Sequence, residues 1–218
     1  MTNFTLDHLF CFCGPHLSSE IENSTKVGLT IHPGNRHPGQ GTANRAILFK
    51  ENYLEFIFMD SPYDAKKNPL RLDKRANWSK TGASPFGICL RGEISQKESN
   101  EFWAYHPPYW PDGVIYIHKS NEDTPEQPMI FVIPSSTRPM DKPNINLSNL
   151  THKTQSEAIR TVEIFGLQYK WPNISRPKNI IFSESKDLQM KVSVDGNISN
   201  EIILNDLLSI NGIAATYE

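Results

Sequence analysis

The chain has 218 residues, of which 38% are hydrophobic and 21% charged, and its formal net charge is −2 at pH 7. This composition is typical of a globular protein and predicts no basic surface for nucleic acid. The sequence has no run of about 18 apolar residues that could span a membrane. The N-terminus lacks a basic stretch followed by a long apolar one, and three cysteines are too few for a disulfide framework. We therefore expect a reduced, cytoplasmic protein without nucleic-acid or membrane partners.

Residues 1–60 predict the element order β-α-β-β-β, which we treat as a first module. The apolar run at 5–13 reads as a strand, and Ser19–Glu22 has the S-x-x-E form of a capping box, so a short helix should end near Val27. A loop rich in Gly and Pro then leads to two β-rich runs at 43–50 and 52–60. The first strand carries Asp7 and His8 among apolar side chains, which raises the question of what a buried imidazole does there.

Residues 84–136 repeat the same order and predict a second module. The preceding segment, 61–83, is polar and lacks clear periodicity, so we expect a linker or a surface excursion. A strand at 84–92 precedes a second S-x-x-E pattern at Ser95–Glu98, which predicts a helix reaching about Tyr105. Strands at 114–120 and 128–136 complete the block. Two blocks of roughly fifty residues with matching elements indicate an internal duplication.

The rest of the chain predicts a coil at 137–157 and a partial third module at 158–218. This module should contain a strand at 158–166, a hairpin at 179–194, a short helix near 202–208 and a final strand at 210–217. We expect it to cover a sheet edge or to mediate homodimerisation.

Several stretches taken together carry a family resemblance. They are the first strand with Asp7 and His8, the loop RHPGQGTAN, the fourth strand YLEFI, the segments WPDGVIYI and PMIFVIP, and THKTQSEAIRTVEI in the third block. As a set they resemble the vicinal oxygen chelate superfamily and, more narrowly, its glyoxalase-like domain proteins. The resemblance implies an α+β fold. Paired βαβββ modules would form a cup-shaped mixed sheet, with an additional C-terminal partial module.

The resemblance also implies a metal site. In metal-using superfamily members, ligands lie on the first and fourth strands of each module and hold a divalent ion at the cup floor. His8 and Glu55 occupy those strands, and an imidazole and a carboxylate suit Zn²⁺, Mn²⁺, Fe²⁺ or Ni²⁺. The alternative interpretation is a buried hydrogen-bonded or ionic pair between neighbouring strands. Strict alternation along the first strand places Asp7 on the opposite face, so we do not expect it to be a ligand.

The second module lacks the matching ligands. Gly87 stands where a counterpart of His8 is expected, and the last strand, MIFVIP, has neither carboxylate nor imidazole. Substitutes elsewhere are His118, His37, Glu163 and His152. His152 lies in a polar stretch and is most simply solvated.

Other residues are candidates for substrate binding. His37 and Asn44 belong to the Gly-rich loop or the strand after it, where the alternative role of the glycines is only to form turns. Tyr53 shares a strand face with Glu55, and Tyr116 shares one with His118. These residues contact substrate only if their faces line the cup. We expect Cys11, Cys13 and Cys89 to serve in core packing.

Two hypotheses for function follow from the resemblance. The first is a divalent-metal-dependent enzyme of lyase, isomerase or dioxygenase type, acting on a small molecule with vicinal oxygens through His8 and Glu55. The second is a metal-free protein that binds or sequesters a small molecule in the same cup. The His8/Glu55 pair at the expected strand positions favours the first, and the missing ligands of the second module favour the second.

Overall fold

The computed structural model describes residues 4–14, 17–137, 152–198 and 201–212. Its larger sheet has nine strands in the order β2-β4-β5-β1-β6-β9-β8-β7, with β3 paired to β4. The strands are β1 (Thr5–Phe12), β2 (Ile31–His32), β3 (Arg36–His37), β4 (Thr42–Leu48), β5 (Tyr53–Met59), β6 (Phe86–Arg91), β7 (Phe102–Tyr105), β8 (Ile115–His118) and β9 (Met129–Ile133). The fold is α+β, as expected.

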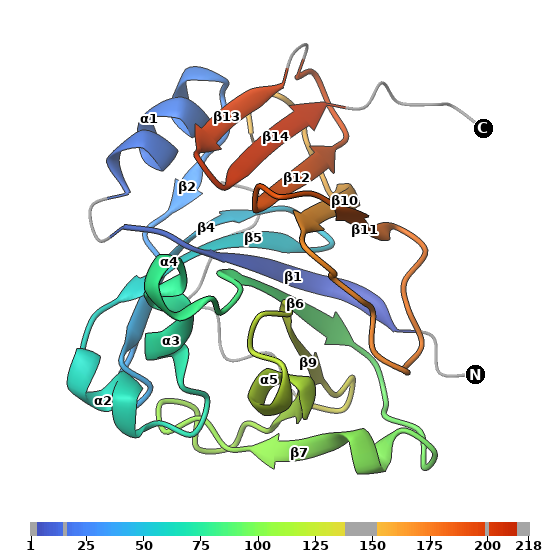
Figure 1. The fold of residues 1–218 in the computed structure, drawn as a ribbon. Helices are drawn as coiled ribbons and strands as arrows, with labels where there is room; N and C mark the ends of the chain where they lie inside the picture. The colour runs from blue at the N-terminus through green and yellow to red at the C-terminus, as the bar shows by residue number, and fades with distance from the viewer. Residues whose placement is uncertain (1–3, 15–16, 138–151, 199–200, 213–218) are drawn as a thin grey trace.

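The two modules meet through β1 and β6, which run antiparallel at the middle of this sheet. Each of these strands pairs in parallel on its other side with the last strand of its own module, β1 with β5 and β6 with β9. The sheet is therefore mixed and has an approximate internal symmetry about the β1–β6 pair. Figure 1 shows how these strands are arranged, and side chains of both modules line a pocket on the concave face of the sheet.

A second sheet of five strands follows in the order β11-β10-β12-β14-β13. Its strands are β10 (Ile159–Gly166), β11 (Ile180–Glu184), β12 (Gln189–Val194), β13 (Ile202–Asn205) and β14 (Leu208–Gly212). One hydrophobic cluster joins Leu9 and Leu54 of the large sheet to Val162 and Met190 of the small one, so the main core lies between the sheets. The concave face of the large sheet is not part of this core.

The small sheet repeats the pairing pattern of the centre of the large one. Along β11-β10-β12-β14-β13 the pairs are parallel, antiparallel, parallel and antiparallel, as they are along β5-β1-β6-β9-β8. Both central antiparallel pairs also carry a register shift near the start of the first strand, at Leu6/His8 and at Ile159/Thr161. The third block is thus built on the same pairing plan as the two modules.

Helices are short and lie mainly outside the sheets. They are α1 (Ser18–Lys26), α2 (Pro62–Lys67), α3 (Leu72–Ala76), α4 (Trp78–Thr81) and α5 (Ser120–Asp123). Segment 61–83, expected as a linker or surface excursion, contains α2, α3 and α4, which its lack of periodicity did not indicate. It buries Ala65, Leu70, Leu72 and the whole side chain of Arg75. None of the helices in the described part of the chain is long and apolar enough to cross a membrane.

Two predicted helices are corrected. Ser95 and Glu98 do form the expected local hydrogen bonds, but only a 3₁₀ turn, η1 (Ser99–Glu101), follows before β7 begins at Phe102. Pairing of β7 with β8 outweighs the helix signal. Near 202–208, Ile202–Asn205 forms β13 and pairs with β14, in keeping with its β-branched side chains. Most of the coil expected at 137–157 and the end of the strand expected at 210–217 lie outside the described residues.

Candidate functional site

The concave face encloses a cavity of about 620 Å³. Its polar wall comes from the first module and includes His8, His37, Asn44, Tyr53 and Glu55. Its apolar wall comes largely from the second module and the helical segment before it. The principal apolar residues are Leu70, Leu72, Trp110, Ile115, Ile117, Met129, Phe131 and Ile133. A site of this kind suits a molecule with a polar end and an apolar body.

Asp7 and His8 both face this cavity, although they are neighbours in one strand. The pairing of β1 with β6 shifts register between Leu6 and His8, so Asp7 is the extra residue of a β-bulge. The bulge interrupts the alternation of side chains and brings Asp7 beside the imidazole, with its Oδ1 atom 2.7 Å from Nδ1 of His8. The expectation that Asp7 lies on the opposite face is corrected.

Arg91 also contacts Asp7 and keeps it ionised. Arg91 at the end of β6 places its Nε 2.8 Å and its Nη2 2.6 Å from Asp7 Oδ2. Burial raises the pKa of Asp7, but the hydrogen bond from His8 and the charges of His8 and Arg91 outweigh burial and lower this pKa to about 2. Asp7 is therefore a carboxylate at neutral pH and accepts the Nδ1–H hydrogen of His8. In the neutral ring, Nε2 then carries a lone pair.

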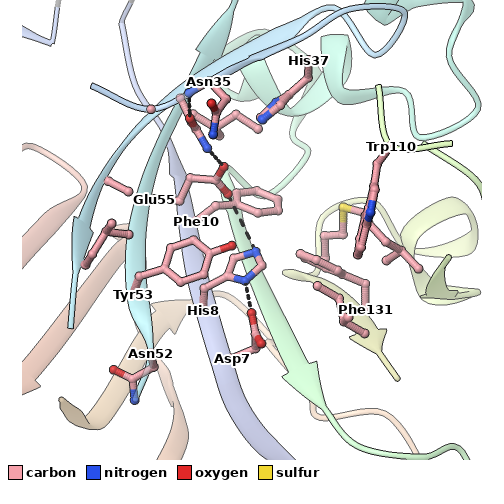
Figure 2. A pocket seen from close by; sticks show the side chains of 18 of the residues that line it. Asp7, His8, Phe10, Asn35, His37, Asn52, Tyr53, Glu55, Trp110 and Phe131 are labelled. Atoms are coloured by element: carbon pink, nitrogen blue, oxygen red, sulfur yellow. Dashed lines mark hydrogen bonds and ion pairs between the residues drawn. The ribbon is translucent and has the colours of Figure 1, made fainter. Parts of the chain in front are cut away.

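The Nε2 atom of His8 faces Glu55 on β5, 3.9 Å from Oε2 (Figure 2). That distance is too long for a direct hydrogen bond. Both side chains are buried, with 5% of His8 and 7% of Glu55 exposed. Tyr53 stacks on the His8 ring, with 4.2 Å between the ring centroids and 17° between the planes. His8 is thus fixed in orientation on one side by Asp7 and over its face by Tyr53.

Glu55 is held from its other oxygen. Asn44 on β4 donates a hydrogen bond from Nδ2 to Glu55 Oε1, and its own Oδ1 accepts from the backbone N–H of Asn35 at 2.6 Å. Gly34 permits this arrangement, because its φ is +73° and a Cβ there would overlap the backbone of Asn44. The loop at Gly34 and Asn35 therefore holds Asn44, and Asn44 orients the carboxylate of Glu55.

His37 lies at the opposite end of the polar wall. Its Nδ1 is 3.0 Å from Thr42 Oγ1, and its ring stacks on Tyr109 with 4.6 Å between centroids. Burial lowers the pKa of His37, although the charges of Glu55 and Asp60 act in the other direction. His37 is accordingly neutral at pH 7.

Among the described residues, the second half of the cup has no counterpart of this polar wall. The strand β6 carries Gly87, and a Cβ at that position would overlap the ring of Phe10, which fills the space. Along β9 the inward positions are Met129, Phe131 and Ile133. The site is therefore built from one module, while the other supplies apolar contact.

The ligand set was tested against a divalent ion. Among the described residues, the one group of three acidic, His or Cys side chains with ligand atoms within 4.8 Å of one another is Asp7, His8 and Cys89, which leaves out Glu55. Arg91 already neutralises Asp7, and burial raises the pKa of the Cys89 thiol well above its usual range, so both oppose a cation there. His8 and Glu55 offer two ligands without a third from a described acidic, His or Cys residue. The residues do not fit a metal centre held by three protein ligands.

The predicted site residues divide into two groups. His8, His37, Asn44, Tyr53 and Glu55 all line the cavity. Tyr116 and His118 do not, because the inward positions of β8 are Ile115 and Ile117. Tyr116 packs against the core between the sheets, and His118 lies near Ser120 and Glu101.

The remaining candidates lie elsewhere. His152 is buried, not solvated: its Nδ1 accepts from Thr30 N–H, and its Nε2 donates to the Leu48 carbonyl. Glu163 accepts a hydrogen bond from Ser183 in the small sheet. All three cysteines are free thiols, and Cys11 and Cys89 are fully buried.

Some cavity residues were missed. The cavity is also lined by Arg91, Tyr109 and Trp110. Their positions depend on contacts with residues far away in the sequence, so no local pattern indicated them. For Trp110, the nearby Gly113 is a weak sequence signal, because a side chain at that position would overlap the indole ring.

Comparison with known proteins agrees with the resemblance. Residues 6–105 match the family described as glyoxalase-like domain. A hypothetical protein from Staphylococcus aureus is similar in structure, with a TM-score of 0.58 and 13% identity over 97% of this chain and 100% of that one. A hypothetical protein from Bacillus halodurans gives a TM-score of 0.43 with 11% identity, covering 63% of this chain and 98% of that one.

Methylmalonyl-CoA epimerase from Mycobacterium tuberculosis gives a TM-score of 0.41 with 11% identity, covering 62% of this chain and 88% of that one. The similarity to the Staphylococcus protein shows that the two chains share a fold. The two lower scores do not show a shared fold. No curated protein matches the sequence.

Proposed function

We propose that this chain, whose residues 6–105 match the glyoxalase-like domain family, is an enzyme that moves protons at the oxygen-bearing end of a small molecule bound in its cup. One observation carries the proposal. His8 Nε2 and Glu55 Oε2 face each other across 3.9 Å at the buried polar wall of the cavity, without a direct hydrogen bond.

The chemistry follows from what each atom can hold. Asp7 accepts the Nδ1 hydrogen of His8, so the Nε2 lone pair and the Glu55 carboxylate are two basic atoms that face the same space. A ligand group with a removable hydrogen, such as a hydroxyl or a C–H beside a carbonyl, would satisfy both. Glu55 and His8 are the catalytic residues of this proposal, and Asp7 and Asn44 position them.

The rest of the cup selects the substrate class. Phe131 and Trp110 lie opposite the polar wall (Figure 2). Met129 and Ile117 add further apolar lining to the cavity. We therefore expect a compound that has an aromatic or aliphatic body and adjacent oxygens at one end, processed by an isomerase or lyase reaction. No step of this proposal uses a metal ion.

Deuterium exchange tests the proposal. α-Hydroxy ketones and 2-oxo acids with alkyl or aryl substituents would be incubated with the protein in D₂O, and loss of the proton next to the carbonyl followed by NMR. Wild-type protein should accelerate exchange for at least one compound. Glu55→Gln and His8→Gln should each lower the rate by about 10²–10⁴-fold, the usual contribution of a general acid or base. Tyr116→Phe, outside the cavity, should have no effect. Exchange equal to buffer for every compound would contradict catalysis.

A second candidate function is binding without turnover. The observation that favours it is the apolar second half of the cup, where the positions opposite the polar wall are Met129, Phe131 and Ile133. A compound that quenches Trp110 fluorescence or raises the melting temperature, without exchanging its proton, would support this alternative.

A further inference from the structure

A buried chain of polar side chains leads to His37, and the mechanism above does not use it. It runs through Asn68, Tyr105, Gln40 and Thr42, so it links the helical segment, the second module and the Gly-rich loop. All of these side chains are buried. The direction of each hydrogen bond can be derived from one end.

The first step is fixed by a backbone amide. Asn68 Oδ1 accepts from the N–H of Leu70 at 3.0 Å, so the Nδ2 group must point the other way. It donates to the Tyr105 hydroxyl oxygen at 2.8 Å. The Tyr105 hydroxyl, having accepted this bond, donates its own hydrogen to Gln40 Oε1 at 3.3 Å.

The next two steps follow. With its oxygen used by Tyr105, Gln40 turns Nε2 toward Thr42 and donates to Oγ1 at 3.0 Å. Thr42 has one hydroxyl hydrogen left, and His37 Nδ1, at 3.0 Å, is its acceptor among the described residues. His37 Nδ1 is therefore the atom without a hydrogen.

The tautomer of His37 is thereby set. Because Nδ1 accepts, the neutral ring carries its hydrogen on Nε2, and burial keeps the ring neutral by lowering its pKa. Stacking on Tyr109 holds the plane of the ring. His37 lines the cavity, and its Nε2 has no hydrogen-bond partner among the described residues.

We propose that His37 is a neutral hydrogen-bond donor that holds a carbonyl oxygen of the ligand through Nε2–H, with its tautomer set by the chain from Asn68 to Thr42. This assignment rests on the proposed function and deepens it. When Glu55 Oε2 takes the proton from carbon and becomes a carboxylic acid, the C–H electron pair forms a C=C bond and the carbonyl π pair moves to oxygen. His37 stabilises the charge on that oxygen, and return of the proton reverses the shift.

A hydrogen-bond donor at His37 restricts which compounds can be substrates. The ligand must offer an acceptor oxygen to His37 and a removable hydrogen to the His8–Glu55 pair on the neighbouring atom. This favours 2-oxo acids and α-hydroxy ketones over compounds whose oxygens are all hydroxyls. Replacement of the ketone by a secondary alcohol should weaken binding at least tenfold in wild-type protein and much less in His37→Phe, which can keep the stack on Tyr109.

Nitrogen-15 NMR of histidine-labelled protein tests the assignment without a ligand. The His37 resonances, identified by their loss in His37→Asn, should report the Nε2–H tautomer in wild-type protein. Thr42→Ser keeps the hydroxyl and should keep this tautomer. Thr42→Val removes the hydrogen bond to the Nδ1 lone pair and should move the Nδ1 resonance downfield. A wild-type ring protonated on Nδ1, or an unchanged Nδ1 resonance in folded Thr42→Val, would overturn the proposal.

The tautomer of His37 and the deuterium exchange of the ligand can fail independently of each other. If exchange is fast and depends on Glu55 but His37 carries its hydrogen on Nδ1, the assignment fails and the acid–base pair stands. If His37 shows the Nε2–H tautomer and no compound exchanges, the tautomer chain stands and the proposed reaction fails. In an enzyme with both features, Thr42→Val should lower exchange roughly tenfold and Thr42→Ser should leave it near the wild-type rate.

Discussion

The carboxylate of Asp7 contacts the imidazole of its chain neighbour His8, with 2.7 Å between Oδ1 and Nδ1. Neighbours in a regular strand point to opposite faces, so this contact depends on the bulge in β1. A histidine that acts as a base is usually oriented by a carboxylate. Because of the bulge, the neighbouring residue Asp7 provides that carboxylate for His8. No second strand has to provide it.

This contact predicts a pH-dependent stability. The pKa of Asp7 is about 2 in the folded protein against 3.8 for a free side chain. Ionised Asp7 therefore stabilises the fold above about pH 4, and this stabilisation is lost as pH falls toward 2. The shift is equivalent to about 2 kcal/mol. In urea unfolding, the difference between wild type and Asp7→Asn should be larger by about this amount at pH 6 than at pH 2. An equal difference at both values would contradict the account.

Replacement of Gly87 tests the packing of the cup floor. A methyl group there would overlap the Phe10 ring, so Gly87→Ala should cost roughly 1–3 kcal/mol and push Phe10 toward the cavity. Gly14 is a matched control, because a Cβ at that position meets no atom within 4 Å. Thermal unfolding of the two variants checks the prediction, and equal melting temperatures would refute it.

Asn52 joins the two sheets at the turn between β4 and β5. Its Oδ1 accepts from Ile159 N–H at 2.7 Å, and its Nδ2 donates to the Ile159 carbonyl at 3.1 Å. Asn52→Ala leaves two buried backbone groups without partners, which should cost about 2–4 kcal/mol. The exposed ion pair of Lys50 with Glu157 spans the same junction, and Lys50→Ala should cost less than about 1 kcal/mol. Urea unfolding distinguishes them, and similar losses would show that Asn52 does not hold the junction.

Much of the polar wall could be located from the sequence, because side chains alternate between the two faces of a strand. His8 and Glu55 lie on the strands that the resemblance indicated, and Tyr53 faces the cavity with Glu55, two residues away, as alternation requires. The same rule misled for Asp7, since a bulge leaves no clear mark in one sequence. It also paired Tyr116 with His118 without revealing that Ile115 and Ile117, not they, face the cavity.

Long-range contacts account for what sequence alone missed. Arg91 reaches Asp7 only because β1 and β6 are neighbours in the sheet, and these strands are far apart in the chain. The chain from Asn68 to His37 likewise unites three segments. Local patterns also failed where pairing decided the structure, as in β7 and β13, which form strands in place of predicted helices.

The central claim, that His8 and Glu55 move protons without a metal ion, is tested most directly by deuterium exchange in protein treated with a chelator. The measurement would use the compound that wild-type protein exchanges fastest, before and after chelation and after addition of Mn²⁺, Zn²⁺, Fe²⁺ or Ni²⁺. The account predicts the same rate in every sample and a rate at least a hundredfold lower in Glu55→Gln. Loss of exchange on chelation, restored by one of these ions, would contradict it and favour metal-assisted chemistry.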